Sequence, residues 1–202
     1  MKLKRNILGL FISKARLENL SKFYLIRVVY KRLMRLNGIL NITIILKNSE
    51  YINSPPPEPN NIKLVDKIEE LKNYKLPNRL CDLLTHNYFS KSSKLFIISE
   101  KEEIIAYSWL HSNFEPDGDL SLLNISNYYA VGPTFVNTSF RNKGLSKNLF
   151  HSICNYANRE KRLPLYIGVQ FDNIPIIKAR LNTGYKLKNI IIRLKNHQNI
   201  IL

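Results

Sequence analysis

Cysteine, acidic residues and long apolar runs are all scarce in this sequence of 202 residues. Its two cysteines, Cys81 and Cys154, lie far apart and lack the spacing of metal ligands. We therefore predict no metal site and interpret both as small buried residues in a reducing compartment. No apolar run approaches the roughly 18 residues that a membrane-spanning helix needs. A signal peptide is not expected either, because Lys14 and Arg16 interrupt the first apolar run and no small-residue cleavage site follows. We expect a cytoplasmic protein.

Acidic residues are outnumbered by basic ones, 15 against 31, which leaves a formal net charge of +16. Residues 1–50 carry eleven Lys and Arg against two Glu, so over half of the excess lies there. Within this segment, residues 17–36 are predicted to form a basic amphipathic helix. Such a helix can dock its apolar face on the rest of the protein, lie on an anionic membrane surface or follow nucleic acid. Docking is the preferred interpretation. Peripheral membrane contact stays open, and no motif supports nucleic acid.

Prolines predict a boundary in the chain. Pro55, Pro56, Pro57 and Pro59 lie close together, and proline disfavours both helix and strand pairing. We predict a basic extension over residues 1–50, with a strand at 39–46, a proline-rich linker over 51–61, and a globular domain over 62–202. A hydrophobic fraction of 45% fits a folded domain.

The periodicity of apolar residues predicts a mixed α/β domain after the linker. Two apolar runs at 95–99 and 103–110, joined by charged residues, indicate a hairpin. The other expected elements are a short strand at 62–65, helical patterns near 67–71 and 79–88, strands at 128–136 and 163–169, helices at 145–157 and 173–184, and a closing strand pair within 186–194.

The most informative stretch runs from Val136 to Ser146, where a strand passes through a basic turn into a helix. Such a turn points backbone N–H groups and the positive end of a helix dipole at one place, which suits a phosphate. Gly144 allows the backbone to approach a ligand closely. Three residues add cationic charge nearby: Arg141, Lys143 and Lys147.

This stretch resembles motif A of the GNAT family, the acetyl-CoA-dependent N-acetyltransferases. Thr138 stands where that motif often has proline, and Ser146 replaces its last glycine or alanine. The residues in register with the motif are Val136, Phe140, Arg141, Lys143 and Gly144.

A second stretch is similar to motif B of the same family. There an Asn after a strand opens a helix that ends in Gly-Phe or Gly-Tyr, and Asn173 and Gly184-Tyr185 match at that spacing. The two resemblances cover roughly residues 62–195. They imply the acyl-CoA N-acyltransferase fold, an α/β fold with a mixed sheet, preceded here by the basic helical extension.

The resemblance also implies acetyl-CoA as the acyl donor. In the family, two parallel strands splay apart and the pantetheine arm pairs with the exposed edge of one of them, while amides of the turn hold the pyrophosphate. The alternative is that the turn is merely solvated and that Asn173 is only a helix cap. The implied cofactor-binding residues are Phe135, Val136, Arg141, Asn142, Lys143, Gly144, Leu145, Ser146, Lys147 and Asn173.

Acyl transfer to an amine requires a neutral amine, a stabilised oxyanion and a tolerated thiolate. The family's frequent general acid, a Tyr in the motif B helix, corresponds to Arg180. An arginine does not usefully donate a proton, but it could stabilise the thiolate or contact a phosphate, unless it faces solvent. His111 is a candidate base, with a structural role as the alternative, and Tyr129 is a candidate catalytic residue, with packing or lining of the acceptor site as the alternatives. A positioned water is the alternative.

The predicted function is therefore transfer of an acetyl or other short acyl group from acyl-CoA to a primary amine by direct attack. The acceptor stays open between a small amine, an amino sugar and the N-terminus or a lysine of a peptide. Two other functions stay open: a GNAT-like domain that binds a ligand or partner without catalysis, and a basic membrane- or RNA-associated protein whose motif matches are accidental.

Overall fold

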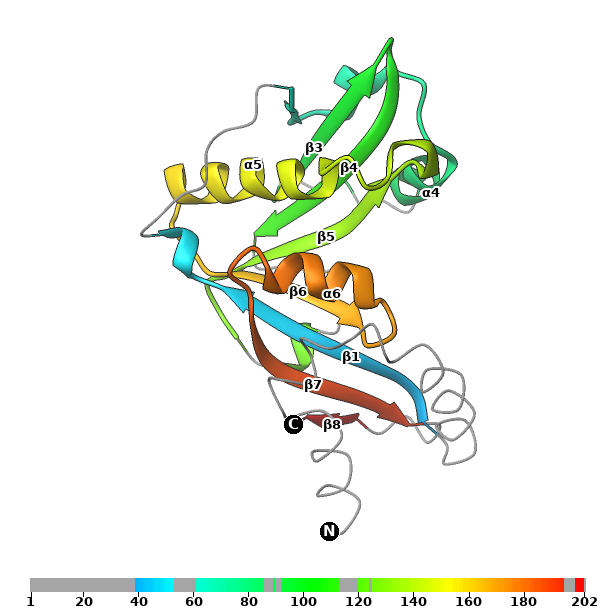
Figure 1. Ribbon diagram of the computed structural model, residues 1–202. Helices are drawn as coiled ribbons and strands as arrows, with labels where there is room; N and C mark the ends of the chain where they lie inside the picture. Colours follow the sequence, from blue (N-terminus) through cyan, green and yellow to red (C-terminus); the bar gives the residue numbers. More distant parts are fainter. Residues whose placement is uncertain are drawn as a thin grey trace.

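The protein is built on one mixed sheet, seen in a computed structural model that describes residues 39–52, 61–85, 89, 92–112, 120–123, 125–194 and 199–201 (Figure 1). The strands are β1 (Ile39–Asn48), β2 (Lys63–Val65), β3 (Ser93–Glu100), β4 (Glu103–Ser112), β5 (Tyr129–Val136), β6 (Leu165–Gln170), β7 (Lys186–Leu194) and β8 (Asn199–Ile201). The α-helices are α4 (Asn78–Thr85), α5 (Leu145–Arg159) and α6 (Ile174–Leu181), and short 3-10 helices are η2 (Glu50–Ile52), η3 (Ile68–Leu71), η4 (Leu120–Leu123) and η5 (Thr138–Phe140).

The strands lie in the order β2-β3-β4-β5-β6-β1-β7-β8. Every neighbouring pair is antiparallel except β5 and β6, which run parallel. That parallel ladder is short: Tyr129 pairs with Leu165 and Ala130 with Tyr166, and no later residues of the two strands pair. The two halves of the sheet are therefore joined at one end of β5 and β6 and separate toward the other.

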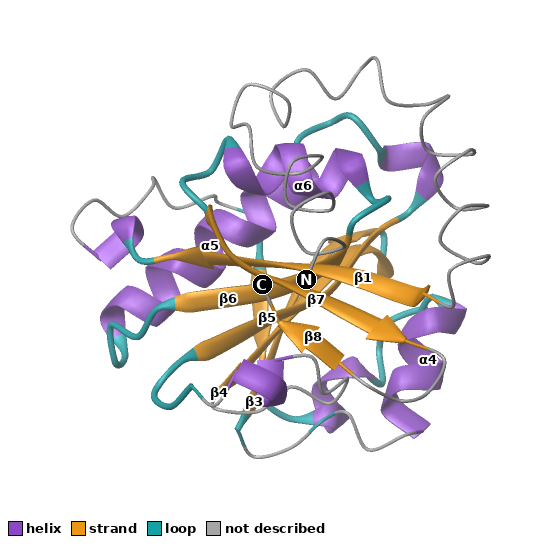
Figure 2. Cartoon of the chain, turned by 90° about the horizontal axis from the view of Figure 1, so that it is seen from below, coloured by secondary structure: helices purple, strands orange, loops and turns teal. Residues whose placement is uncertain are grey.

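Helices cover both faces of the sheet, with α5 and α6 on one face and α4 on the other (Figure 2). The apolar stripe of α5 includes Leu149, Phe150 and Ile153, which pack with residues of β3 to β6. On the opposite face, Leu80 of α4 packs with a cluster that includes Tyr107 and Trp109 of β4. Apolar burial on both faces fixes the positions of the strands from which the site below is built.

The predicted hairpin is confirmed as β3 and β4. Its turn residues, Lys101 and Glu102, have φ angles of 47° and 65°. Two consecutive residues with positive φ are the signature of the tight turn whose twist matches that of paired strands. The charges of these residues keep the turn at the surface, while the apolar runs on either side enter the core.

The predicted boundary at residue 50 is wrong for β1. This strand was assigned to the extension, but it lies inside the sheet, hydrogen-bonded to β6 on one side and to β7 on the other. Ile42, Ile45 and Leu46 are at most 1% exposed. The proline-rich segment separates β1 from the later strands in sequence only, because strand pairing brings them together again in space.

Three smaller expectations also change. Residues 68–71 form a 3-10 helix, and 186–194 form one strand that pairs with β1 and β8 in place of a closing pair. Cys154 is buried as predicted, but Cys81 is exposed on α4. The predicted basic helix at 17–36 lies outside the described residues. Among the helices that the structure describes, none is long and apolar enough to cross a membrane.

Because β1 is central, we predict that deleting residues 1–50 abolishes folding, whereas deleting 1–38 leaves a cooperative thermal transition. Loss of β1 leaves two unpaired strand edges and an exposed apolar face, which promote aggregation. The two truncations are compared by solubility and by circular dichroism on heating. A soluble, cooperatively melting 51–202 fragment would contradict the prediction.

Candidate functional site

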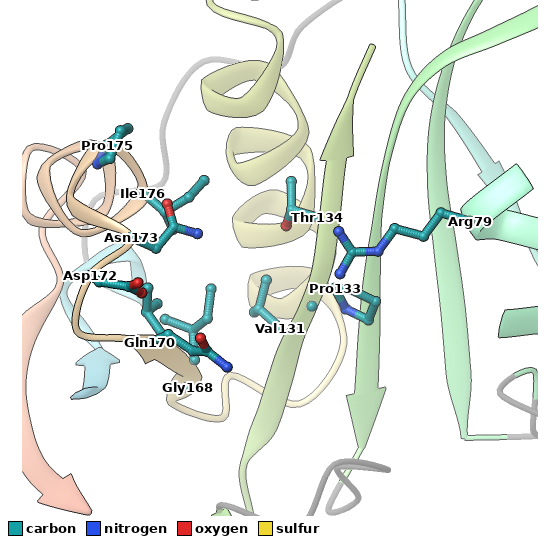
Figure 3. Close-up of a pocket in the computed structure, with 13 residues that line it drawn as sticks. Arg79, Val131, Pro133, Thr134, Gly168, Gln170, Asp172, Asn173, Pro175 and Ile176 are labelled. Atoms are coloured by element: carbon teal, nitrogen blue, oxygen red, sulfur yellow. The ribbon is translucent and has the colours of Figure 1, made fainter. Parts of the chain in front are cut away.

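The separation of β5 from β6 opens a cavity of about 670 Å³ between them, which we call the inner cavity. Backbone and side chains of both strands line it, together with the segment that enters α6 (Figure 3). Its lining residues are Arg79, Val131, Gly132, Pro133, Thr134, Ile167, Gly168, Val169, Gln170, Asp172, Asn173, Pro175 and Ile176.

A second cavity of about 600 Å³, the outer cavity, lies between the carboxyl end of β5, the turn before α5 and the side of α6. Five residues line both cavities, so together they form one groove: Arg79, Thr134, Asn173, Pro175 and Ile176. Figure 3 shows Thr134 between Arg79, which reaches in from α4, and Asn173 and Ile176 on the α6 side. The other residues of the outer cavity are Phe135, Val136, Phe140, Arg141, Asn142, Gly144, Leu145, Ser146, Lys147 and Ala179.

Local interactions shape the turn from residue 137 to residue 144. The side chain of Asn137 accepts a hydrogen bond from the backbone N–H of Ser139 at 3.1 Å. Asn142 and Gly144 adopt left-handed backbone conformations, with φ of 63° and 76°. Gly144 is the N-cap of α5. Its left-handed backbone conformation would be strained for most residues that carry a side chain.

The backbone N–H groups of the turn lie beside the outer cavity. In the part of the chain that the structure describes, the amides of residues 142–146 donate no hydrogen bond. The hydroxyl oxygen of Ser146 is buried and also has no partner there. Free amides at the positive end of a helix dipole form an anion site, so this part of the groove suits phosphate groups.

The charge of the outer cavity agrees with that interpretation. Arg79, Arg141 and Lys147 line it, and no Asp or Glu is among its lining residues. The guanidinium of Arg141 is oriented by a 3.4 Å hydrogen bond from its Nε to the carbonyl of Val136. Cations around unpaired amides strengthen the local attraction for an anion.

Nine of the ten predicted cofactor-binding residues line the outer cavity, and Lys143 is the exception. Its ammonium lies 4.8 Å from the centre of the ring of Phe140, which does line the outer cavity, in a cation–π contact. Asn173 precedes α6 but its side chain makes no capping hydrogen bond. It lines both cavities, and its contact with the cofactor stays a prediction.

Arg180 is buried at 1% exposure and does not face solvent. Its Nη2 donates to the hydroxyl of Thr134 at 3.3 Å, and its guanidinium carbon lies 4.8 Å from the centre of the Phe150 ring. Burial lowers the pKa of this guanidinium, but an arginine stays protonated in proteins. Arg180 is therefore a cation held directly behind the groove wall.

His111 does not line the groove. It is fully buried on the face of β4 that carries Trp109, and its Nδ1 lies 2.8 Å from the hydroxyl of Ser93. Burial lowers the pKa of this imidazole to about 4, so it is neutral at neutral pH and a weak base. The geometry does not favour the predicted role as a general base.

Tyr129 also lies away from the groove. It is 5% exposed and packs in the core beneath α5. Burial, followed by the neighbouring Tyr156 and Glu160, raises the pKa of its phenol. A buried phenol with a raised pKa has no access to a substrate in the cavities, so a catalytic role for Tyr129 is not favoured.

The sequence analysis did not predict that the side chains of three residues line the groove. Arg79 lies in a helical pattern without any motif, and Asp172 comes directly before Asn173 at the end of β6. Thr134 is not among the predicted site residues, although it lines both cavities. No sequence signal identifies Arg79, because only the tertiary packing of α4 beside β5 brings it to the groove. Asp172 could have been found from its place beside the motif B Asn.

Comparison with known proteins agrees with this geometry. The family model described as "Acetyltransferase (GNAT) family" matches residues 59–179. No curated protein matches the sequence.

Solved structures share the fold at low sequence identity, and three of them are similar over most of this chain. A GNAT-family protein from Novosphingobium aromaticivorans has a TM-score of 0.54 at 12% identity, over 76% of this chain and 64% of its own. A conserved protein of unknown function from Staphylococcus epidermidis has a TM-score of 0.52 at 11% identity, over 80% of this chain and 64% of its own. A GNAT-family acetyltransferase from Colwellia psychrerythraea has a TM-score of 0.51 at 14% identity, over 81% of this chain and 59% of its own.

This chain thus spans about 60% of the length of those structures. Its mixed sheet, with one short parallel pair, confirms the predicted fold class. Because the family model covers more than half of the 202 residues, the predicted family is confirmed as well. The chain is a member of the acetyltransferase (GNAT) family.

Proposed function

We propose that the protein transfers an acetyl or other short acyl group from acyl-CoA to a primary amine. The observation that carries the proposal is the groove between β5 and β6, which ends under the unbonded amides of residues 142–146. A long ligand with an anionic end and an extended, amide-containing arm fits this combination.

The residues present suit each part of acyl-CoA. The amides of the turn, the hydroxyl of Ser146 and the cations Arg141 and Lys147 would bind the phosphates. Beyond Ala130, β5 has no strand partner on the side of β6. An unpaired strand edge binds an extended amide chain as an added strand, so residues 134–136 would hold the pantetheine arm.

Acyl-CoA supplies a thioester, whose carbonyl carbon the amine nitrogen attacks directly. The contribution of the protein is mainly to hold the thioester and the amine close together in a fixed orientation. Asp172 brings a carboxylate to the inner cavity and would attract a cationic amine. Since His111 lines neither cavity, a water molecule is the proposed route by which the proton leaves the amine.

A second candidate is a domain that binds acyl-CoA without transferring the acyl group. It is favoured by one observation: neither of the expected acid–base side chains, His111 and Tyr129, lines the cavities. Saturable acetyl-CoA binding without release of free CoA, across small amines, amino sugars and peptides, would support this second candidate.

The first test is thermal unfolding with acetyl-CoA, CoA or ATP. Ligand at about 100 times its dissociation constant stabilises the folded state by about 2.7 kcal/mol. For a chain of this size the midpoint should rise by about 5–10 °C. We expect that rise with acetyl-CoA and CoA and a smaller one with ATP, which has phosphates but no pantetheine arm. No rise with either CoA compound would contradict the proposed function.

We predict that Gly144→Glu weakens acetyl-CoA binding by at least about tenfold relative to Gly144→Gln. Both variants carry a side chain of the same size at a left-handed position, so both lose about 1–2 kcal/mol of folding stability. Only Glu adds a negative charge beside the phosphate site. Isothermal titration calorimetry gives the two affinities, and equal values would contradict a phosphate site at this turn.

Arg79→Gln is expected to weaken acetyl-CoA binding about tenfold and to make the binding less sensitive to salt. Its guanidinium lines both cavities and makes no hydrogen bond or ion pair with the described residues. Arg159→Gln is the matched control, because it removes the same charge from the exposed far end of α5. The affinities are measured at low and high salt, and an equal effect of the two substitutions would rule out a specific role for Arg79.

A further inference from the structure

Thr134 lies where the inner and outer cavities meet, and its hydroxyl contacts two buried side chains. The hydroxyl of Ser108 is 2.8 Å from it, and Arg180 Nη2 is 3.3 Å from it. Ser108 is fully buried and Arg180 is 1% exposed. These bonds link β4, β5 and α6 at one point of the groove wall.

The direction of the hydrogen bonds follows from the number of donors and acceptors. A hydroxyl has one proton and two acceptor positions, and a guanidinium can only donate. In the described part of the protein, Thr134 is the sole partner of the Ser108 hydroxyl. A buried hydroxyl proton without an acceptor is costly, so Ser108 donates to Thr134. Both acceptor positions of Thr134 are then occupied, and its own proton is available to the groove.

The charge behind Thr134 makes its hydroxyl a stronger donor. Arg180 forms no ion pair with the described residues, and its Nε has no hydrogen-bond partner there. Its neighbours Cys154 and Tyr185 are neutral, because burial raises the pKa of both groups. A buried cation without a counter-charge polarises the hydroxyl that it contacts and favours negative charge nearby.

We propose that Thr134 is a catalytic hydrogen-bond donor that stabilises the thiolate leaving acyl-CoA, and that Arg180 polarises it. This inference rests on the proposed function. With the phosphates at the turn and the acyl group in the inner cavity, the sulfur that joins arm and acyl group would lie where the two cavities meet. Thr134 is the β5 residue at that junction.

The step balances without any proton transfer from Thr134. The amine nitrogen forms a bond to the carbonyl carbon, the carbon–sulfur bond breaks, and its electron pair stays on sulfur. Thr134 donates a hydrogen bond to that thiolate and keeps its proton. The proton that the amine loses passes through water and protonates the thiolate when CoA leaves.

The test compares CoA with desulfo-CoA, in which hydrogen replaces the thiol, and measures both dissociation constants between about pH 7 and pH 9. A site that prefers thiolate lowers the pKa of the bound thiol below its ordinary value of about 8.5. The affinity for CoA relative to desulfo-CoA then rises with pH. We expect about a tenfold rise in wild type, because hydrogen bonds to charged groups have about that effect.

Variants assign that rise to the Thr134 hydroxyl. Thr134→Ser keeps the hydroxyl and should keep the rise, whereas Thr134→Val should lose it. Ser108→Ala should leave the rise unchanged. An increase in Ser108→Ala would show that Thr134 normally donates to Ser108, which would overturn the assigned direction. The charged groups that face this point are Arg79, Asp172 and Arg180, and carboxylates and guanidinium groups ordinarily keep their charge over this pH range.

Two results would overturn the proposal. In one, the ratio of the wild-type affinities for CoA and desulfo-CoA does not depend on pH. In the other, Thr134→Val keeps the full rise of that ratio with pH. The wild-type measurement stands alone if Thr134→Val fails to fold. Failure of wild type to bind either compound would overturn the proposed function itself, so the two failures are distinct.

Discussion

The short parallel pairing of β5 and β6 is the constraint on which the groove depends. Two residue pairs hold the strands together at one end, and beyond them the strands separate. Beyond that point the groove is bordered by three features. They are the exposed edge of β5, the basic turn at its carboxyl end and the entry to α6 after β6. A longer ladder would close the groove, and an absent one would leave the two halves of the sheet unconnected through hydrogen bonds.

Several of the buried polar groups gather where the strands separate. Ser108, Thr134 and Arg180 make one chain of hydrogen bonds at the groove wall, and Ser108 and Arg180 are buried. Burying a guanidinium without a carboxylate costs stability. A function that uses the charge would account for its position, since the same side chain could otherwise be replaced by an apolar one.

The sequence predicted what local chemistry determines. The turn from Val136 to Ser146 and the helix that begins at Asn173 could be found because glycine, asparagine and charge spacing act locally. The place of β1 could not, because strand pairing in space ignores a proline-rich segment in the chain. Arg79 and the burial of His111 likewise depend on how α4 and β4 pack. Catalytic assignments from side-chain type alone were therefore weaker than the assignment of the groove.

The central place of β1 also has a consequence for how the protein reaches its native state. Thr43 pairs with Gln170 of β6 and with Ile191 of β7. The first described strand in the sequence therefore cannot pair until β6 and β7, near the end of the chain, have been synthesised. Contacts between such distant segments slow folding, because a long loop has to close first. During synthesis, the apolar strand Ile39–Asn48 leaves the ribosome well before its partners exist, and it needs protection from aggregation throughout that interval.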